Sequence, residues 1–223
     1  MQDDDFWRQA SLVFHERASE YDGWFEESLL FDIELAAVRQ LGTPLAGPKL
    51  EVGVGPGRFA EGLEVDFGLD PAFAPLRFAQ KRSVQVCQAV GEALPLREQS
   101  LGTIFLLFTL CFLGEPQVTL AECRRVLRAD GHLVLGTIVA DSPWGMMLQQ
   151  KKAEGHPFYR HARFYDPGEV ERWLANLGFR VVERRSSLRQ APQDLKGYEA
   201  SRAGLAPDAG FAIIVARKTF CAN

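Results

Sequence analysis

The sequence predicts an α/β fold with one doubly wound, mostly parallel sheet of seven strands. Short apolar runs typical of buried strands alternate with segments of helical periodicity, which is the pattern of repeated β-α-β units. One run, residues 49–53, leads through a glycine-rich turn into a helix, and another, residues 103–108, is apolar enough to be covered on both faces. The chain of 223 residues is long enough for one well-buried core, so we expect one domain over residues 1–223.

The first part of that domain, residues 1–43, is expected to be a helical lead-in. From residue 6 to about residue 42 the pattern is helical, with apolar residues at i, i+4 and i+7 counted from Phe31. Gly23 favours a break between two helices, and Gly42 is placed as a C-terminal stop.

Residues 44–139 are expected to form the core of the sheet, in which five strands alternate with helices. The last helix of this part begins near Glu115 and Pro116, and we expect it to stop at the turn formed by Asp130 and Gly131. The expected strands span residues 49–53, 67–70, 84–90, 103–108 and 132–137, and the other expected helices span residues 58–63 and 73–81.

Residues 140–223 are expected to add the acceptor-side helices and the last two strands. Asp166 is placed as the N-cap of a helix, with Pro167 at its first position and Glu169 in its first turn. Two more strands are expected over residues 179–185 and 211–217, and they bring the number of strands to seven.

The charge balance argues against a nucleic-acid partner. The formal net charge is -4 at pH 7, whereas binding to phosphates depends on clustered lysines and arginines. The one basic run is interrupted by Glu183, and we interpret it as a solvated strand face. It consists of Arg180, Arg184, Arg185 and Arg189.

The cysteines and the hydropathy favour a cytoplasmic protein. Cys87, Cys111, Cys123 and Cys221 show no C-x-x-C spacing, so no metal site is expected and the compartment is interpreted as reducing. The chain starts with acidic residues, and no apolar run approaches the ~20 residues that cross a bilayer, so we expect no membrane partner. The oligomeric state stays open.

A glycine-rich turn joins the first strand to its helix. Gly53, Gly55 and Gly57 allow the backbone to turn tightly and to approach a ligand, and the free N–H groups at the helix start attract negative charge. We interpret the turn as a cofactor site, with a purely structural turn as the alternative. A nicotinamide fingerprint requires its third glycine at position 58, where this chain has Arg58.

The spacing of this turn resembles motif I of the class I S-adenosylmethionine-dependent methyltransferases, in which an acidic residue stands two before a G-x-G-x-G triplet. Further likenesses are Asp70 followed by Pro71 at the end of the second strand, and the loop of residues 91–96. The resemblance covers residues 21–139, and within the class it is to the type 11 small-molecule methyltransferases. It implies a Rossmann-like methyltransferase fold with an N-terminal helical lid.

The resemblance also implies S-adenosyl-L-methionine as cofactor and a role for several residues. Asp70 would hold the ribose hydroxyls, since a carboxylate accepts two donors, and Glu51 would steady the ammonium group. Tyr21 would fold over the cofactor, although it is equally well read as core together with Trp24 and Phe25. The implied cofactor-binding residues are Tyr21, Glu51, Gly53, Gly55, Gly57, Asp70, Pro71, Gly91, Glu92, Phe108 and Thr109.

The acceptor site is expected between the fifth strand and the helix capped by Asp166. His156, Tyr159 and His161 are candidates for a general base, which is needed only if the acceptor loses a proton during attack. Arg160 and Arg163 either hold an acidic acceptor or face solvent, and Cys111 either lines the site or is a buried apolar residue.

The function expected from these features is in-line methyl transfer to a small-molecule acceptor, whose identity and attacked atom stay open. No Asn- or Asp-Pro-Pro-Tyr element follows the fourth strand, which counts against methylation of nucleic-acid bases. Two alternatives remain at this point. One is a module that binds the cofactor or its demethylated product without turnover, and the other is a nicotinamide-dependent oxidoreductase, which Arg58 disfavours.

Overall fold

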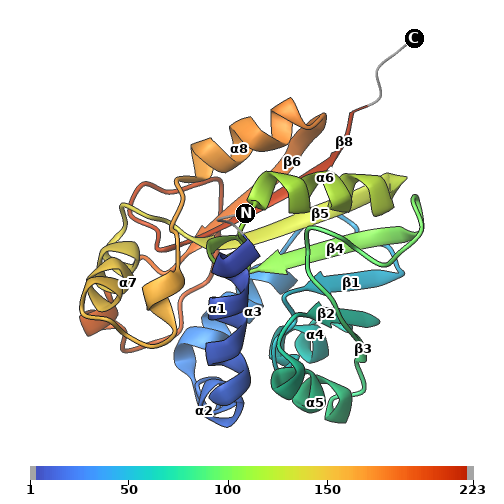
Figure 1. Cartoon of the computed structure of the whole chain (residues 1–223). Helices are drawn as coiled ribbons and strands as arrows, with labels where there is room; N and C mark the ends of the chain where they lie inside the picture. The colour runs from blue at the N-terminus through green and yellow to red at the C-terminus, as the bar shows by residue number, and fades with distance from the viewer. Residues whose placement is uncertain (1–3, 220–223) are drawn as a thin grey trace.

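The computed structural model of the chain describes residues 4–219, and its secondary structure alternates between helices and strands (Figure 1). The helices are α1 (Asp4–Glu16), α2 (Ala18–Gly23), α3 (Leu29–Arg39), α4 (Arg58–Gly62), α5 (Phe73–Lys81), α6 (Pro116–Val126), α7 (Pro143–Ala153) and α8 (Pro167–Asn176). The strands are β1 (Lys49–Val52), β2 (Phe67–Asp70), β3 (Gln85–Gln88), β4 (Leu101–Leu107), β5 (Leu127–Ile138), β6 (Phe179–Ser187), β7 (Arg202–Ala203) and β8 (Phe211–Lys218). Short 3₁₀ turns lie at Leu110–Phe112, Tyr159–His161 and Pro192–Asp194.

The sheet confirms the predicted fold class. Its strand order is β3-β2-β1-β4-β5-β8-β6-β7, and the first five of these strands are parallel. Strand β8 pairs antiparallel with both β5 and β6. The sheet has eight strands instead of the expected seven, because a short strand of two residues, β7, lies at its edge. The strand order reverses between β1 and β4, and ligands bind at such a switch point, outside the carboxyl ends of the strands.

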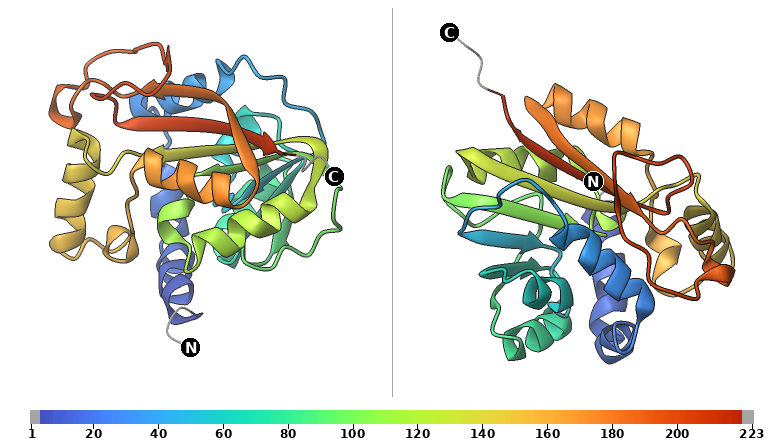
Figure 2. Two further views of the ribbon diagram at one scale, coloured as in Figure 1. Left: turned by 90° about the horizontal axis from the view of Figure 1, so that it is seen from above. Right: turned by 180° about the vertical axis from the view of Figure 1, so that it is seen from behind.

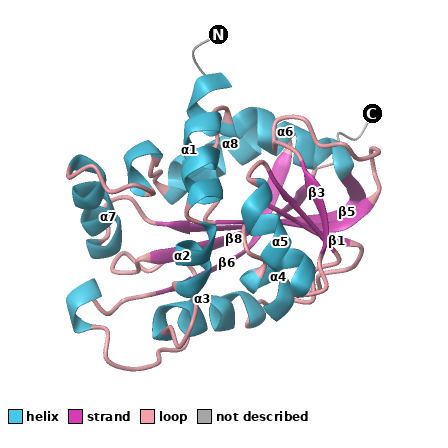
Figure 3. Cartoon of the chain, turned by 60° about the horizontal axis from the view of Figure 1, so that its bottom comes forward, coloured by secondary structure: helices cyan, strands magenta, loops and turns pink. Residues whose placement is uncertain are grey.

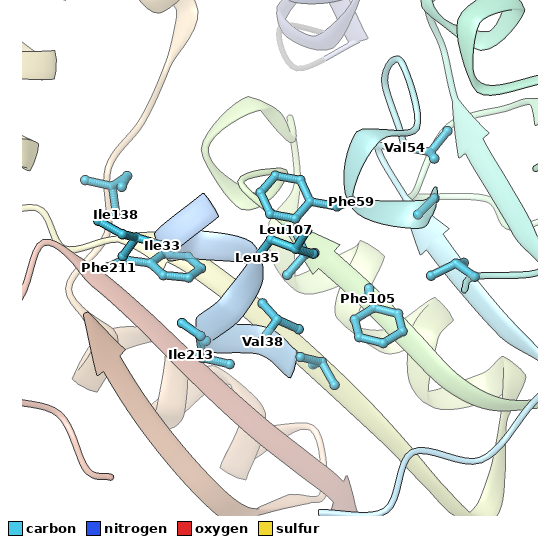
Figure 4. Close-up of a cluster of buried hydrophobic side chains, with 14 of the residues drawn as sticks. Ile33, Leu35, Val38, Val54, Phe59, Phe105, Leu107, Ile138, Phe211 and Ile213 are labelled. Carbon is cyan, nitrogen blue, oxygen red and sulfur yellow. The ribbon is translucent and has the colours of Figure 1, made fainter. Parts of the chain in front are cut away.

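Helices cover both faces of the sheet, as a doubly wound fold requires. One face is covered by α3, α4, α5 and α7, and the opposite face by α6 and α8. Figure 4 shows the first of these layers, in which Ile33 and Val38 of α3 lie with Phe105 of β4 and Ile213 of β8. These four side chains are at most 2% exposed, so α3 is anchored by burial of apolar area and belongs to the core of the sheet.

Two features of the fold differ from the expectation. The helix before the fifth strand ends at Val126, and β5 starts at Leu127, so the prediction of a helix reaching the Asp130–Gly131 turn was wrong. Leu127 is fully buried and pairs with Leu101, and this tertiary pairing ends the helix early. Helix α7 was not singled out from the sequence, although Ser142 caps it by accepting the backbone N–H of Gly145.

The N-terminal helices α1 and α2 lie beside the sheet rather than on one of its faces. Figures 2 and 3 show α1 between α7 and α5, and both α1 and α2 contact α5. Helix α2 ends at Gly23, so the predicted break is confirmed. Within residues 4–219, no helix is long and apolar enough to cross a membrane.

Candidate active site

The glycine turn between β1 and α4 is held in place by backbone hydrogen bonds. The N–H of Gly53 donates to the carbonyl of Leu69 over 2.7 Å, and Gly53, Gly55 and Gly57 all have positive φ. A Cβ on Gly53 would lie 2.5 Å from Oγ1 of Thr109, and one on Gly57 would lie 2.8 Å from Cα of Ala79. Both the backbone conformation and the packing therefore require glycine at these positions.

Asp70 ends β2 and connects this strand to the glycine turn. Its Oδ2 accepts the N–H of Gly55 over 2.9 Å, and its Oδ1 accepts the N–H of Ala72 over 2.8 Å. Burial raises the pKa of Asp70 to about 6, and these two hydrogen bonds act in the opposite direction. Each carboxylate oxygen retains one lone pair for a further donor, so the group is able to accept two ligand hydroxyls.

A first cavity lies outside the carboxyl ends of β1, β2 and β4, with a volume of about 710 Å³ that includes the part open to solvent. Most of the residues that the sequence suggested for a cofactor line it. They are Tyr21, Gly53, Gly55, Asp70, Pro71, Gly91, Glu92, Phe108 and Thr109. The suggested residues that do not line it are Glu51 and Gly57. The wall is completed by α1, which contributes Trp7 and Phe14.

Glu51 is buried in β1 beneath the glycine turn. Its side chain is 2% exposed, and Oε2 has no hydrogen-bond partner. Burial raises the pKa of Glu51 well above its usual range, and the nearby Asp70 raises it further. A backbone hydrogen bond from Ala60 acts in the opposite direction, but the unpartnered Oε2 is costly to bury, so a cation at the turn would stabilise it.

Phe108 and Thr109 form the junction after β4. Phe108 has a positive φ of 58°, a strained conformation for an aromatic residue, and its ring stacks on Phe211 at 4.9 Å. The hydroxyl of Thr109 donates to the carbonyl of Val52 over 2.9 Å. This hydroxyl is therefore engaged in joining β1 to the β4 junction, in keeping with backbone rather than side-chain contacts to a ligand.

Tyr21 of α2 stands between the first cavity and a neighbouring one. A Cβ on Gly55 would lie 3.1 Å from Cε1 of Tyr21, so the ring rests directly on the glycine turn. The ring also makes edge contacts with Phe14, Trp24 and Phe25. Burial raises the pKa of Tyr21 well above its usual range, as does the negative charge of Asp70.

The neighbouring residue Asp22 fixes α2 to the glycine turn, which the sequence did not reveal. Its carboxylate accepts two hydrogen bonds from Arg58, at 2.7 and 2.9 Å, and one from Arg82. Burial alone would raise the pKa of Asp22, but the hydrogen bonds from both arginines outweigh it and the pKa is lowered. Arg58, which follows the third glycine, therefore holds α2, the helix that carries Tyr21.

A second cavity adjoins the first and has a volume of about 1260 Å³, again including the part open to solvent. The two cavities share Phe14, Tyr21, Phe108 and Phe112 as walls. The other walls of the second cavity come mainly from the residues just after α2, from α3 and α7, and from the turn at Tyr159, and they are mostly aromatic or aliphatic. They include Trp24, Phe25, Leu30, Phe31, Phe59, Trp144, Met147, Leu148, Phe158, Tyr159 and Phe164.

Glu34 of α3 is the carboxylate in this apolar wall, and it was not predicted from the sequence. Its side chain is 6% exposed, and burial raises its pKa well above the usual range. The available signal was a glutamate between Ile33 and Leu35, two apolar residues of the helix.

The residues suggested for acceptor chemistry are only partly brought together. Tyr159 lines the second cavity, and burial raises the pKa of its hydroxyl. His156 and His161 do not line it, and burial lowers the pKa of both imidazoles. The ring of His156 lies 4.9 Å from that of Tyr159, and its Nδ1 is buried without a partner.

Three other suggested residues are placed as follows. Arg160 donates to Nε2 of His161, and Arg163 reaches the carbonyl of Gly114, so neither arginine lines the second cavity. Cys111 does line it, and its thiol donates to the carbonyl of Phe108. Burial raises the pKa of this thiol to about 12. Cys221 lies outside the described residues.

Three arginines of the basic run, two in β6 and one just after it, are engaged with acidic and polar side chains. Arg184 forms two hydrogen bonds of 2.6 Å with Glu171 of α8, and Arg185 donates to Ser201. Arg189 lies 3.9 Å from the carboxylate of Glu199. These contacts stabilise the sheet edge.

The residues present fit S-adenosylmethionine at three points. The buried oxygen of Glu51 lacks the partner that an ammonium group would provide. The glycine turn leaves open the space that a Cβ on Gly55 would fill next to Tyr21. Asp70 keeps lone pairs free at the cavity for hydroxyl donors.

Comparisons with known proteins agree with this fit. A family described as "Methyltransferase domain" matches residues 50–135. A protein from Mycobacterium bovis that carries no functional name is 43% identical over 212 residues, which cover 93% of this chain and 74% of that protein. Malonyl-[acyl-carrier protein] O-methyltransferase 1 of Coxiella burnetii is 32% identical over 157 residues, which cover 66% of this chain and 51% of that enzyme.

Among solved structures, similarity extends over nearly the whole chain. The crystal structure of a SAM-dependent methyltransferase from Thermotoga maritima, described as a possible histamine N-methyltransferase, has a TM-score of 0.86 and 31% sequence identity. The match covers 93% of this chain and 99% of that one. These matches favour neither the nicotinamide-dependent nor the binding-only alternative.

Proposed function

Since the chain belongs to the class I S-adenosylmethionine-dependent methyltransferases, we propose that it methylates a small-molecule acceptor held in the second cavity. The enzyme class and the cofactor follow from the family. The observation that carries the acceptor proposal is the apolar, largely walled second cavity, which shares four aromatic residues with the first. Concave and mostly apolar cavities of this kind suit small ligands, whereas a macromolecule docks on a broader surface.

The proposed cofactor site uses the residues around the first cavity. Gly53, Gly55 and Gly57 give the backbone its close approach, and Asp70 accepts the ribose hydroxyls. Glu51 neutralises the ammonium group from beneath the turn. Residues 91–92 border the adenine, and residues 108–109 offer backbone contacts near the methyl group.

Bound S-adenosylmethionine supplies a methyl group that is already activated by its sulfonium. The chain's own task is therefore to align the acceptor and to exclude water, effects worth up to about 7–11 kcal/mol in well-oriented reactions. Tyr21, Phe108 and the other shared aromatic residues line both cavities, so they border the place where cofactor and acceptor would meet. Tyr159 and Glu34 are titratable groups at hand if the acceptor must lose a proton.

The named relatives support different acceptor classes. The Thermotoga maritima protein is described as a possible histamine N-methyltransferase, which favours a small acceptor. The Coxiella burnetii enzyme is named for an acyl-carrier protein, but it is matched over only half of its length. The walls of the second cavity therefore carry more weight than either name. We further propose a cytoplasmic location, supported by the free cysteines Cys87, Cys111 and Cys123.

The test is transfer of labelled methyl groups from S-adenosylmethionine to an extract of the source cells, separated afterwards into low-molecular-mass and macromolecular fractions. We expect label in the low-molecular-mass fraction. Gly55→Arg should abolish it, because an arginine at a φ of 50° would collide with Tyr21. Gly197→Arg is the matched control, since nothing lies within 4 Å of a Cβ there. Label confined to protein or nucleic acid would contradict the proposal.

A further inference from the structure

Glu34 faces the second cavity from the helix that also forms its apolar floor. It lies on the same side of α3 as Leu30 and Phe31, one turn earlier, and all three line the cavity. The neighbouring residues Ile33 and Leu35 point instead into the core of the sheet. The carboxylate is thus directed at the place proposed for the acceptor.

No cation neutralises this carboxylate. In the described part of the chain, the Glu34 side chain forms neither a hydrogen bond nor an ion pair. Burial raises the pKa of Glu34, and Lys151, which also lines the cavity, forms no ion pair with it. A buried carboxylate is costly without a partner, and the fold supplies none.

The other polar groups of the cavity are mostly engaged elsewhere. The hydroxyl of Ser28 accepts the N–H of Phe31, the thiol of Cys111 donates to Phe108, and the indole of Trp144 donates to Gln190. Tyr159 is close enough for the charge of Glu34 to contribute to the raised pKa of its hydroxyl. Glu34 is therefore the acidic group of this cavity that is left to recognise a ligand.

The aromatic rings around Glu34 favour a positively charged ligand group. Phe25, Phe31, Phe59 and Tyr159 line the same cavity, and the faces of aromatic rings attract cations. A cation among these rings would also favour the ionised form of Glu34.

We infer that the acceptor is an amine with an apolar or aromatic body, and that Glu34 binds its ammonium group while the rings enclose the rest. This inference rests on the proposed function, since it assigns the acceptor to the second cavity. Glu34 is a specificity-determining residue in this account, and it acts by direct contact with the acceptor.

The test compares three probes of one shape in the presence of saturating S-adenosylhomocysteine: 2-phenylethylamine, 2-phenylethanol and 3-phenylpropanoate. Dissociation constants are measured calorimetrically for the wild type, for Glu34→Gln and for Asp32→Asn. The last variant removes a carboxylate from the exposed side of the same helix. We expect the wild type to prefer the amine over the alcohol by about tenfold or more, as a charge-assisted hydrogen bond implies.

Glu34→Gln should lose this preference while binding the alcohol as the wild type does, and Asp32→Asn should keep it. Unchanged S-adenosylhomocysteine binding by each variant shows that it is folded. The inference is overturned if the amine preference survives in Glu34→Gln, or if the wild type shows no amine binding at about 10 mM. A Glu34-dependent amine preference together with label only in macromolecules would instead overturn the proposed function.

Discussion

The contact between Asp22 and Arg58 offers the sharpest test of how the helix carrying Tyr21 is held. Asp22→Asn keeps the shape of the side chain but removes its charge. In the wild type this carboxylate accepts three hydrogen bonds from Arg58 and Arg82. The side chains of Asp22, Arg58 and Arg82 are 11%, 19% and 15% exposed, so the cluster is largely buried.

The expected loss lies between two limits. An exposed ion pair contributes about 0–1 kcal/mol, and removal of one partner from a fully buried pair costs about 3–5 kcal/mol. We therefore expect Asp22→Asn to lower the free energy of unfolding by about 2 kcal/mol, which for a chain of this size lowers Tm by roughly 4–8 °C. S-adenosylhomocysteine should bind several-fold more weakly, because Tyr21 loses its anchor.

The assays are thermal unfolding and calorimetric titration, and Glu20→Gln is the control. Glu20 pairs with Arg17 one turn away in the same region, but these side chains are 49% and 47% exposed, so less than about 1 kcal/mol is expected. Because the pKa of Asp22 is lowered, its contribution is present above the unfolded value of about 4 and is lost as pH falls through the folded value. Wild-type unfolding and binding in Asp22→Asn at pH 7 would refute this account.

Three further outcomes are expected. S-adenosylhomocysteine binding should weaken as pH falls through about 6, where Asp70 becomes protonated, and Asp70→Asn should bind weakly with little pH dependence; a titration of both proteins checks this. Glu34→Gln should raise Tm at pH 8 and converge with the wild type near pH 5, because stability from a carboxyl with a raised pKa is present below its unfolded pKa and lost as pH rises through the folded one. Gly57→Ala should cost more than about 1 kcal/mol in chemical denaturation, given its φ of 81° and Ala79 at 2.8 Å, whereas Gly23→Ala, with nothing within 4 Å, should be neutral or stabilising.

Much of the cofactor half of the site was predictable because its signals are local. The strand, glycine turn and helix that contain Gly55 follow one another within about fifteen residues, and Asp70 ends the next strand. The spacing of apolar residues and the residue types of the turns are sufficient to recognise such units. The early end of α6 was not predictable in this way, because the pairing of Leu127 with Leu101 decides it.

The contacts that were missed join residues far apart in sequence. Asp22 lies 36 residues from Arg58 and 60 from Arg82, and no spacing rule connects them. Glu34 was hidden for a related reason, since a glutamate in a helix is ordinarily solvated and only the packed walls show that it is buried.

The division between the two cavities explains why the cofactor is easier to infer than the acceptor. The first cavity is built largely from the ends of β1, β2 and β4, which the sheet topology fixes. The second gathers α3, α7 and the turn at Tyr159, which pack around the sheet but do not set its register. Substitutions there can change the acceptor without disturbing the glycine turn, provided that Phe108 keeps its strained conformation at the shared wall. If the acceptor is held in the second cavity as proposed, its specificity is a property of the helices, and Glu34 is the residue at which we expect it to be altered with the least effect on the cofactor site.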